Sequence, residues 1–458
     1  MANQTINPAT GETVRSFPAH TPAEVDAILD SAAAANHALA GTTVEQRAGW
    51  MRAAADLLEA DVAELAATMT LEMGKTRTSA EAEVAKCVRA MRYFADTAAG
   101  FLADESAVDP TEVNASAARV IYQPLGTVLA IMPWNFPVWQ VIRFAAPGLM
   151  AGNSGVLKHA LNVPQTALYL GELFGRAGFP AGTFQTVLLD EVDCSFLIED
   201  PRVAAVTLTG SVPAGVAVGA VAGGVLKKTV LELGGSDAFI VMPSADLARA
   251  VEVGVASRTQ NSGQSCIAAK RFFVHTDVYD EYAARFTEAM GQLVTGDPDD
   301  PATSFGPLAT ERGRQGVHAL VEDAREHGAT VLVGGTLPDG PGWFYPATVV
   351  ADVTPGMRLF SEECFGPVAA LYRVGSAAEA VAAANDSEFG LSSSAWTTDP
   401  AELELFSRGL QAGGVFLNGM TVSFPQLPFG GVKSSGHGRE LSGHGMHEFC
   451  NVKTVWQG

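Results

Sequence analysis

Cysteine carries the strongest nucleophile among the side chains of this sequence, and Cys266 lies in the segment NSGQSCIAAKR, a Gly/Ser-rich turn followed by residues compatible with a helix. Backbone N–H groups at such a turn favour a thiolate, which predicts a pKa below the usual value of about 8.5. Cys266 is therefore a candidate nucleophile. On this segment alone, a buried, small apolar residue is the commoner alternative.

Glu232 is a candidate general base. It ends an apolar run in VLELGGSD and precedes two glycines. A carboxylate kept partly out of water has a raised pKa and accepts a proton near neutral pH. For an acid taken alone, the last exposed residue of a strand remains the commoner interpretation.

Asn135 is a candidate oxyanion donor. It lies between two prolines and two aromatic residues in PWNFPVWQVIR, where Pro137 predicts the start of a helix that carries Trp139 and Arg143. A fixed amide is a neutral hydrogen-bond donor, as oxyanion binding requires. A helix-capping Asn is an equally good alternative.

Three further segments have features of a dinucleotide site. Gly210 and Ser211 follow the apolar run AAVTL in TGSVPAG, a Gly-rich turn that is typical of phosphate binding but lacks the G-x-G-x-x-G spacing. Lys158 follows SGVL, where it could reach a ribose hydroxyl or phosphate, or simply be a solvated surface lysine. Glu363 forms an acid pair with Glu362 ahead of Phe365, a pattern most often found on a solvated surface.

The cysteines and histidines do not indicate a metal site. His437, His444, His447 and Cys450 lie close together in the sequence but match no standard zinc spacing. The five cysteines are odd in number and form no C-x-x-C pair, which argues against a disulfide framework and favours a reducing cytoplasm. No signal peptide is expected, since MANQTINPATGETV has neither a basic nor an apolar region.

The elements that position these residues are predicted from apolar spacing. In the first hundred residues, Thr21 to Glu24 form a capping box with Pro22 at the first helical position, and Thr78 to Glu81 are expected to open a second helix. The residues Val84, Val88, Met91 and Phe94 recur at helical spacing in that second helix, where Cys87 is expected to pack in the core.

The rest of the chain predicts alternating strands and helices. The runs VIYQPLGTVLAIMPW, SGVLKHA, FQTVLLD and AAVTLTG form one set of predicted strands. A second set comprises LELGGSDAFIVM, KRFFVHT, ATVLVGG, PVAALYRV and GGVFLNG. Strands that alternate with helices in this way predict an α/β protein with doubly wound parallel sheets.

Length and net charge limit the possible number of domains and the possible partners. The chain has 458 residues, 47% of them hydrophobic, and a net charge of −21, which predicts two or three domains with large cores. Nucleic acids and anionic membrane surfaces would repel such a chain, so neither is an expected partner. The charge-free stretch from Val203 to Leu226 is long enough to span a bilayer, but its five glycines and Pro213 favour a buried strand, a turn and a small-residue helix.

Taken together and in this order, these segments resemble the aldehyde dehydrogenase superfamily. The resemblance covers nearly the whole chain and is carried by PWNFP, LELGG, GQSC, EECFGPV and PFGGVKSSG. It implies a Rossmann-type cofactor domain (1–105 and 126–233), an α/β catalytic domain (234–434) and a small β oligomerisation element (106–125 and 435–458). A homodimer or homotetramer would follow.

The resemblance also implies roles for individual residues. Cys266 matches the nucleophile, Glu232 the general base and Asn135 the oxyanion donor, which would work with the backbone N–H of Cys266. The residues that match the NAD(P) site are Trp134, Lys158, Gly210, Ser211, Glu363 and Phe365.

Within the superfamily, the chain is most similar to bacterial succinate-semialdehyde dehydrogenases. Arg143, eight positions after Asn135, is expected to pair with the carboxylate tail of the substrate, and Ser423 to add a hydroxyl. Pairing of Arg143 with an acid at a domain interface is the alternative. Leu161 stands where NAD-preferring relatives carry a Glu, so NADP is slightly favoured over NAD. The alternatives are oxidation of glutarate semialdehyde or a simple aliphatic aldehyde, or a non-catalytic structural or binding protein.

Overall fold

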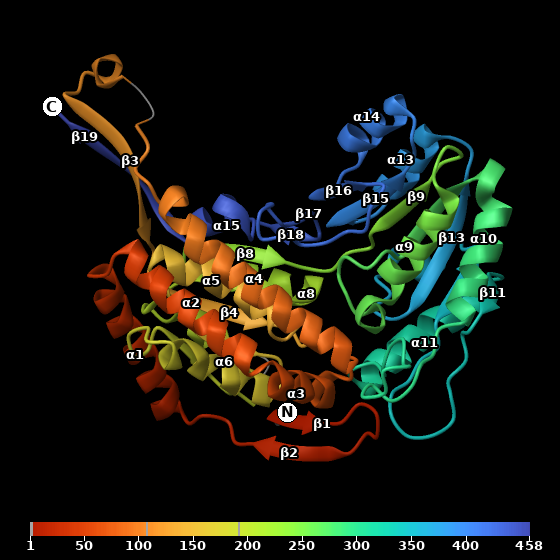
Figure 1. Ribbon diagram of the computed structural model, residues 1–458, viewed down its shortest axis with the longest axis horizontal. Helices are drawn as coiled ribbons and strands as arrows, with labels where there is room; N and C mark the ends of the chain where they lie inside the picture. The colour runs from red at the N-terminus through yellow and green to blue at the C-terminus, as the bar shows by residue number, and fades with distance from the viewer. Residues whose placement is uncertain (1–2, 107–108, 191–192) are drawn as a thin grey trace.

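A computed structural model describes residues 3–106, 109–190 and 193–458. Two β-sheets with helices around them form the body of the molecule, and a two-stranded ribbon projects from it (Figure 1). The predicted oligomerisation segment 106–125 includes residues 107–108, which lie outside the described residues. No helix in the described ranges combines the length and apolarity needed to cross a membrane.

The first sheet has six strands in the order β18-β8-β7-β4-β5-β6. They are β4 (Thr127–Met132), β5 (Ser154–His159), β6 (Phe184–Thr186), β7 (Val203–Thr209), β8 (Lys228–Glu232) and β18 (Gly436–His437). The pairs among β4 to β8 are parallel, and β18 pairs antiparallel with β8. Every residue of β5 is buried, as expected for a parallel strand covered on both faces, and each predicted run of the first set contains a strand of this sheet.

Eight helices accompany this sheet in the described chain. They are α1 (Pro22–Ala40), α2 (Val44–Ala60), α3 (Val62–Met73), α4 (Arg77–Phe101), α5 (Trp139–Ala151), α6 (Pro164–Arg176), α7 (Ser195–Glu199) and α8 (Val212–Gly224). The charge-free stretch thus contains strand β7, a turn and helix α8, as predicted. Helix α4 packs against α2, α3 and α5.

The helix starts test the capping predictions. Thr21 forms the predicted capping box with Glu24. The second prediction is wrong by two residues: α4 begins at Arg77, because the Thr76 side chain accepts a hydrogen bond from the Ser79 amide and caps the helix. The predicted apolar stripe, Val84 to Phe94, is buried, and so is Cys87.

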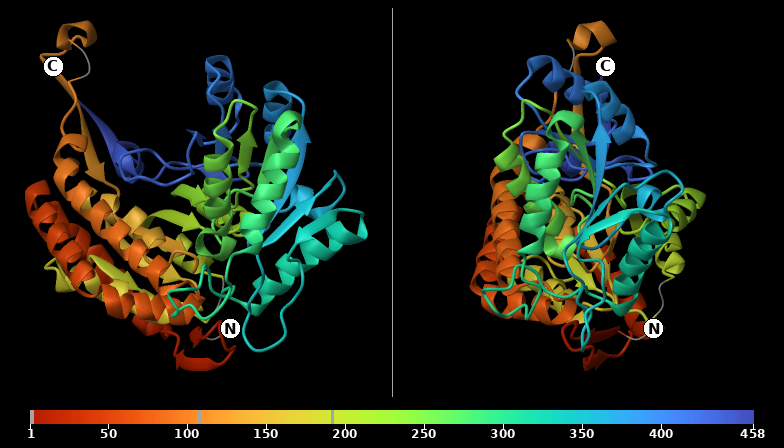
Figure 2. Two further views of the ribbon diagram at one scale, coloured as in Figure 1. Left: turned by 45° about the vertical axis from the view of Figure 1, so that its right-hand side comes forward. Right: turned by 90° about the vertical axis from the view of Figure 1, so that its right-hand side faces the viewer.

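The second sheet has seven strands in the order β11-β12-β13-β10-β9-β15-β16. They are β9 (Ala238–Val241), β10 (Arg271–His275), β11 (Thr330–Val333), β12 (Thr348–Ala351), β13 (Val368–Val374), β15 (Ser392–Trp396) and β16 (Gly414–Leu417). Its helices are α9 (Leu247–Thr259), α10 (Thr276–Gly291), α11 (Glu311–Glu326), α12 (Arg358–Ser361), α13 (Ala377–Asn385) and α14 (Pro400–Gly409). The turned views in Figure 2 show this lobe, in green and blue, beside the N-terminal lobe in red to yellow.

The ribbon consists of β3 (Ala117–Pro124) and β19 (Cys450–Gln457), paired antiparallel over their whole length. The run VIYQPLGTVLAIMPW was predicted as one strand, but it divides at Gly126 (φ 131°) into β3 of the ribbon and β4 of the six-stranded sheet. Strand β18, which lies in the predicted oligomerisation segment 435–458, pairs instead with β8 of the six-stranded sheet.

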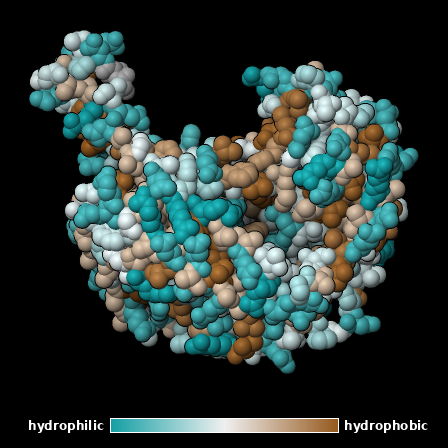
Figure 3. Space-filling model, viewed as in Figure 1, coloured by the Kyte–Doolittle hydropathy of each residue, from teal (hydrophilic) through white to brown (hydrophobic). Residues whose placement is uncertain are grey.

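Short elements complete the fold. They are β1 (Asn3–Ile6), β2 (Thr13–Phe17), β14 (Phe389–Gly390), β17 (Val432–Lys433), α15 (Ser442–Glu448) and the 3-10 turns η1 (Pro110–Val113) and η2 (Gln260–Gly263). Strand β14 pairs with β17, which brings the segment before β18 next to the seven-stranded sheet. The surface between the ribbon and the α13–α14 end is concave, and apolar side chains gather on one side of that hollow (Figure 3).

Candidate active site

The loop that carries Cys266 connects helix α9 and turn η2 to strand β10. Asn261 and Ser262 have left-handed φ angles of 53° and 57°, so the chain leaves helix α9 sharply. Cys266 lies in a turn that leads directly into β10, without the helix that the sequence suggested after it. The side chain is partly exposed and lines a cavity of ≈ 70 Å³ together with residues of α4, α5 and the 421–423 loop.

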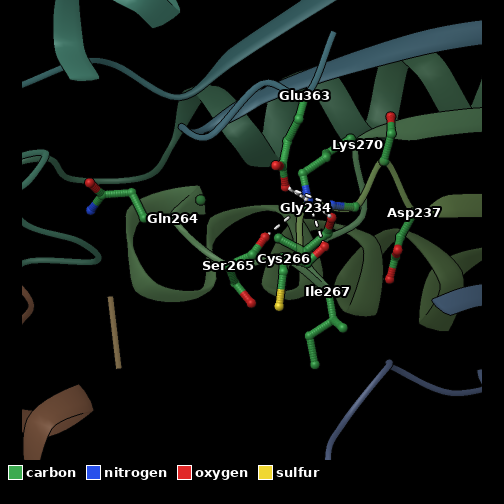
Figure 4. A network of polar contacts seen from close by, with 12 residues as sticks. Gly234, Asp237, Gln264, Ser265, Cys266, Ile267, Lys270 and Glu363 are labelled. Carbon is green, nitrogen blue, oxygen red and sulfur yellow. Dashed lines mark hydrogen bonds and ion pairs between the residues drawn. The ribbon is translucent and has the colours of Figure 1, made fainter. Parts of the chain in front are cut away.

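Lys270 holds this loop in place. Its ammonium donates to the carbonyl oxygens of Ser265 (3.0 Å) and Cys266 (2.8 Å), and it forms an ion pair with Glu363 at 3.3 Å. In Figure 4 the sulfur of Cys266 points away from the Lys270–Glu363 pair. The backbone of the nucleophile is therefore held in place, while its side chain lines the cavity.

The two glycines of LELGG allow three segments to meet. A Cβ on Gly234 would lie 2.4 Å from Glu363 Oε2, and a Cβ on Gly235 would lie 2.6 Å from the Cys266 carbonyl oxygen. Real Cβ atoms do not approach that closely, so a side chain at Gly235 would have to displace the backbone of Cys266, and one at Gly234 would displace the Glu363 carboxylate. The Gly235 amide also donates to Glu363 Oε1 at 3.0 Å, which links this segment directly to the nucleophile loop.

The thiol of Cys266 is not activated in this structure. Burial raises the pKa of Cys266 to about 12, while the nearby cations of Arg143 and Lys270 lower it and the carboxylates of Glu363 and Glu232 raise it. The predicted lowering of this pKa is therefore wrong. The prediction rested on the backbone N–H groups of the turn and on a helix after Cys266; no such helix forms, and burial outweighs the effect of the turn. At neutral pH the sulfur carries a proton that must be removed before attack.

Glu232 ends strand β8 and is 2% exposed, so it is not the exposed strand end of the alternative interpretation. Neither carboxylate oxygen has a hydrogen-bond partner among the described residues. Burial raises the pKa of Glu232, Arg143 opposes that shift, and the neighbouring Glu440 adds to it. A buried carboxylate with a raised pKa is suited to accept a proton near neutral pH.

Arg143 lies on helix α5 one turn after Trp139, and it lines the same cavity as Cys266. Its guanidinium forms an ion pair with Glu440 in which both side chains are buried. It also donates to the Thr209 hydroxyl at 3.3 Å. This pairing with an acid is the alternative that the sequence left open for Arg143.

Asn135 precedes α5, which begins at Trp139 and not at Pro137 as predicted. Asn135 is consequently in the turn before the helix and not on the same helix as Arg143. Its Nδ2 donates to the Gln264 carbonyl oxygen at 3.1 Å, two residues before Cys266. The side-chain oxygen of this buried amide has no partner among the described residues. The amide is therefore beside the nucleophile loop, with its N–H already engaged.

The predicted phosphate turn lies between β7 and α8. Ser211 caps α8 by accepting a hydrogen bond from the Ala214 amide, and the Gly210 amide donates to the Glu232 carbonyl oxygen at 2.9 Å. Lys158, on β5, is buried, which lowers its pKa, and its ammonium makes no hydrogen bond or ion pair within the described ranges. A buried ammonium without a partner is a feature that a bound ribose or phosphate would satisfy.

The other residues assigned to the cofactor lie near the Cys266 loop. Phe365 and Trp134 form an edge-to-face pair with ring centroids 5.9 Å apart. Glu363 is held by the Gly235 amide and by Lys270, so its carboxylate has a fixed position rather than lying on a solvated surface. This arrangement fits a ligand with a ribose and a planar ring. The Glu363 carboxylate can accept hydrogen bonds from the ribose hydroxyls, and the rings of Trp134 and Phe365 lie nearby to contact the planar ring.

Three residues of the site were not found from the sequence. Lys270, Glu440 and Lys86 act through contacts with distant segments; Lys270 lies in the segment that carries Cys266, and Glu440 lies between His437 and His444 in the C-terminal Gly-rich run. For Lys270, the available signal was its position four residues after the candidate nucleophile Cys266. The sequence did not indicate the partner of Glu440, which is Arg143, or that of Lys86, which is Ser423.

The histidines of the C-terminal run contact separate partners. His437 lies 2.9 Å from the Thr229 hydroxyl, while His447 contacts the Phe101 carbonyl oxygen and stacks on Tyr122. Among the described residues, no group of three potential ligands is arranged to hold a metal ion.

Comparison with known proteins matches residues 2–455 to the aldehyde dehydrogenase family. The chain is 58% identical to a protein named aldehyde dehydrogenase from Paenarthrobacter nicotinovorans, over 100% of both chains. It is also 58% identical to succinate-semialdehyde dehydrogenase [NADP(+)] 1 of Mycobacterium ulcerans, over 99% of both chains. A crystal structure of succinic semialdehyde dehydrogenase from Streptococcus pyogenes, in complex with NADP+, superimposes with a TM-score of 0.96, 36% identity and 99% coverage of both chains.

Proposed function

The chain belongs to the aldehyde dehydrogenase family, and from that premise we propose that it oxidises succinate semialdehyde to succinate with NADP+ or NAD+ as the oxidant. The observation that carries the proposal is the cavity beside Cys266, since it joins a nucleophilic sulfur to basic and hydroxyl side chains in one cavity. Its small volume favours a short aldehyde. The names of the most similar relatives support the same substrate.

Cys266 provides the nucleophile in this proposal. The Cys266 thiol first loses its proton to solvent water, and the sulfur then adds to the aldehyde carbon and forms a thiohemiacetal, whose oxyanion requires neutral hydrogen-bond donors. Asn135 Nδ2 is such a donor beside the Cys266 loop, once it exchanges the Gln264 carbonyl oxygen for the substrate oxygen. A bound nicotinamide supplies the hydride acceptor. The thioester that remains on Cys266 is hydrolysed by a water molecule that Glu232 deprotonates.

We assign the cofactor to the turn before α8 and to the neighbouring residues. Gly210 and Ser211 at the N-terminus of α8 would hold phosphate, and Lys158 would contact the adenosine ribose or its phosphate. Glu363 would bind the hydroxyls of the nicotinamide ribose, with Phe365 and Trp134 beside the ring. The buried, unpartnered ammonium of Lys158 supports this assignment.

Leu161 is expected to permit NADP+. Replacing Leu161 with Glu places a carboxylate near the adenosine ribose, where it would repel a 2′-phosphate and bind free hydroxyls. We expect KM for NADP+ to rise at least about tenfold and KM for NAD+ to stay level or fall. Steady-state assays with each cofactor measure the change. Equal effects on the two cofactors would contradict the position assigned to the 2′-phosphate.

The reaction itself is tested with the purified wild-type chain. We expect the highest kcat/KM for succinate semialdehyde in a panel that includes glutarate semialdehyde and butanal, followed at the absorbance band of NADPH. A higher value for glutarate semialdehyde or butanal would replace the substrate with that aldehyde. No turnover with any aldehyde would favour a structural or binding protein.

We also infer a homo-oligomer, either a dimer or a tetramer. Ribbon β3–β19 projects from the body with Val452 and Trp456 exposed by more than half, and β16 leaves an unpaired strand edge among the described residues. Apolar side chains and free strand edges of this kind favour pairing with another chain. A cytoplasmic location fits the need to keep Cys266 reduced.

A further inference from the structure

Asn261 lies in turn η2, five residues before Cys266, and joins the nucleophile loop to the turn that carries Asn135. Its side-chain Nδ2 donates to the backbone carbonyl oxygen of Asn135 at 2.7 Å and to that of Gln264 at 3.1 Å. A side-chain amide nitrogen has two N–H groups, so both donors of Asn261 are used. One side chain therefore connects the candidate oxyanion donor with the loop of the nucleophile.

The Gln264 carbonyl oxygen is the acceptor that Asn135 and Asn261 share. It accepts a hydrogen bond from Asn135 Nδ2 at 3.1 Å and another from Asn261 Nδ2, also at 3.1 Å. A carbonyl oxygen has two lone pairs, so these two donors satisfy it fully. All three residues are buried, and solvent does not readily replace a donor that leaves this oxygen. Its hydrogen bonding therefore depends on the two amides.

Two features of Asn261 lower the stability of the fold. Its φ angle of 53° lies in the left-handed region, which most side chains avoid and asparagine tolerates better than others. Its buried side-chain oxygen has no hydrogen-bond partner among the described residues, which is also unfavourable. Strained backbone and unpaired buried polar atoms are concentrated at functional sites in proteins. The two hydrogen bonds that Asn261 donates are the contribution that offsets these costs.

The backbone of the Asn135 turn is held on both sides. Asn261 binds the carbonyl oxygen of Asn135 itself. Further along the turn, Glu83 on helix α4 accepts hydrogen bonds from the amides of Val138 and Trp139, each at 2.9 Å. With its main chain fixed in this way, Asn135 can change the hydrogen-bond partner of its side chain while its backbone stays in place.

The proposed reaction requires such a change of partner. Asn135 Nδ2 must leave the Gln264 carbonyl oxygen to donate to the oxyanion of the thiohemiacetal. Without Asn261, that carbonyl oxygen would then be buried with no donor, which opposes the change. With Asn261 in place, the oxygen keeps one of its two hydrogen bonds. The free energy needed to release Asn135 is therefore lower.

We propose that Asn261 is a positioning residue that makes Asn135 available to the oxyanion, because it holds the Gln264 carbonyl oxygen when Asn135 leaves it and fixes the backbone of Asn135. This inference rests on the proposed function, in which Cys266 adds to an aldehyde, but not on the identity of that aldehyde. Asn261 acts through Asn135 and Gln264. Its effect is on the rate at which the thiohemiacetal and the thioester form, and not on the binding of the cofactor.

The test replaces Asn261 with Gly, which removes the side chain and adopts a left-handed φ without strain. We expect the rate of the first turnover, followed by stopped-flow absorbance of NADPH, to fall about 10- to 100-fold, because the Gln264 carbonyl oxygen loses its last donor as the oxyanion forms. Asn261→Asp keeps the shape of the side chain but has no N–H group, and should show at least the same loss. It carries the test should Asn261→Gly fail to fold.

Two measurements distinguish this role from a general disturbance of the loop. The Kd for NADP+ should stay within about twofold of wild type, because the residues assigned to the cofactor are unaltered. Cys266 should react with iodoacetamide within about twofold of the wild-type rate, because that displacement occurs at a saturated carbon and forms no oxyanion. The matched control is Ser262→Gly. Ser262 also has a left-handed φ, and its hydroxyl donates to the Gly306 carbonyl oxygen at 3.1 Å, so its loss should change the first-turnover rate less than about threefold.

A double-mutant cycle with Asn135→Ala completes the test. Asn135→Ala alone should slow the first turnover about 10²- to 10³-fold. In that background no side-chain amide moves to the oxyanion, so adding Asn261→Gly should change the rate less than about threefold. An equal loss with and without Asn135, or a wild-type rate in both Asn261 variants, would overturn the inference. A wild-type chain that forms no NADPH with any aldehyde would instead overturn the proposed function, and the inference with it.

Discussion

Replacing Cys266 with alanine is expected to lower kcat by at least about four orders of magnitude, because no other group can form the covalent intermediate. The other four cysteines are buried and lie outside the cavity, so none can substitute for it. Steady-state production of NADPH with succinate semialdehyde measures the effect. Titration of the variant with NADP+ should still show binding, since the residues assigned to the cofactor are unaltered.

The matched control is Cys450→Ala, which removes a buried thiol at the start of the ribbon strand β19. Its kcat should stay within about twofold of wild type, although the loss of packing would lower the stability by about 1 kcal/mol. Substantial turnover by Cys266→Ala would rule out a covalent mechanism through this residue. It would also leave the position of the sulfur in the cavity without a chemical explanation.

The fold was predictable wherever a single segment determines its own structure. Apolar, β-branched runs such as AAVTLTG became buried parallel strands, and the capping box at Thr21 formed as expected. Strand β15 was missed because SSSAW has few residues with high β-propensity, and its pairing with β9 and β16 decides its conformation. Contacts between distant segments override local preference there.

The difference between local sequence and distant contacts also explains which residues of the candidate site could be predicted. Cys266, Glu232 and Glu363 were found because each lies in a Gly-rich motif whose glycines allow close approach. Lys86 gave no such signal, because its partner Ser423 is 337 positions away in the sequence. The activation of Cys266 was predicted wrongly for a related reason. The thiol pKa depends on how deeply the surrounding segments bury the loop, and this cannot be derived from the local turn.

Glu232 is buried without a hydrogen-bond partner in the described chain, and this determines what its loss should do. Its raised pKa means that the carboxylate form is present only above a pH well over the usual carboxyl range. Hydrolysis of the thioester should therefore slow as pH falls through that pKa, while formation of the thioester does not require Glu232 to accept a proton from water. The two half-reactions thus differ in their dependence on this residue.

Replacing Glu232 with Gln should separate those half-reactions. We expect a rapid burst of about one NADPH per active site, followed by turnover slowed about 10²- to 10⁴-fold, because the amide cannot deprotonate water. Stopped-flow absorbance measures the burst, and mass spectrometry should detect the acyl group on Cys266. Glu362→Gln, an exposed acid one residue from Glu363, should keep continuous turnover. Full steady-state turnover of Glu232→Gln would mean that another group deprotonates the hydrolytic water. Absence of a burst would mean that Glu232 acts before hydride transfer, as the acceptor of the Cys266 proton.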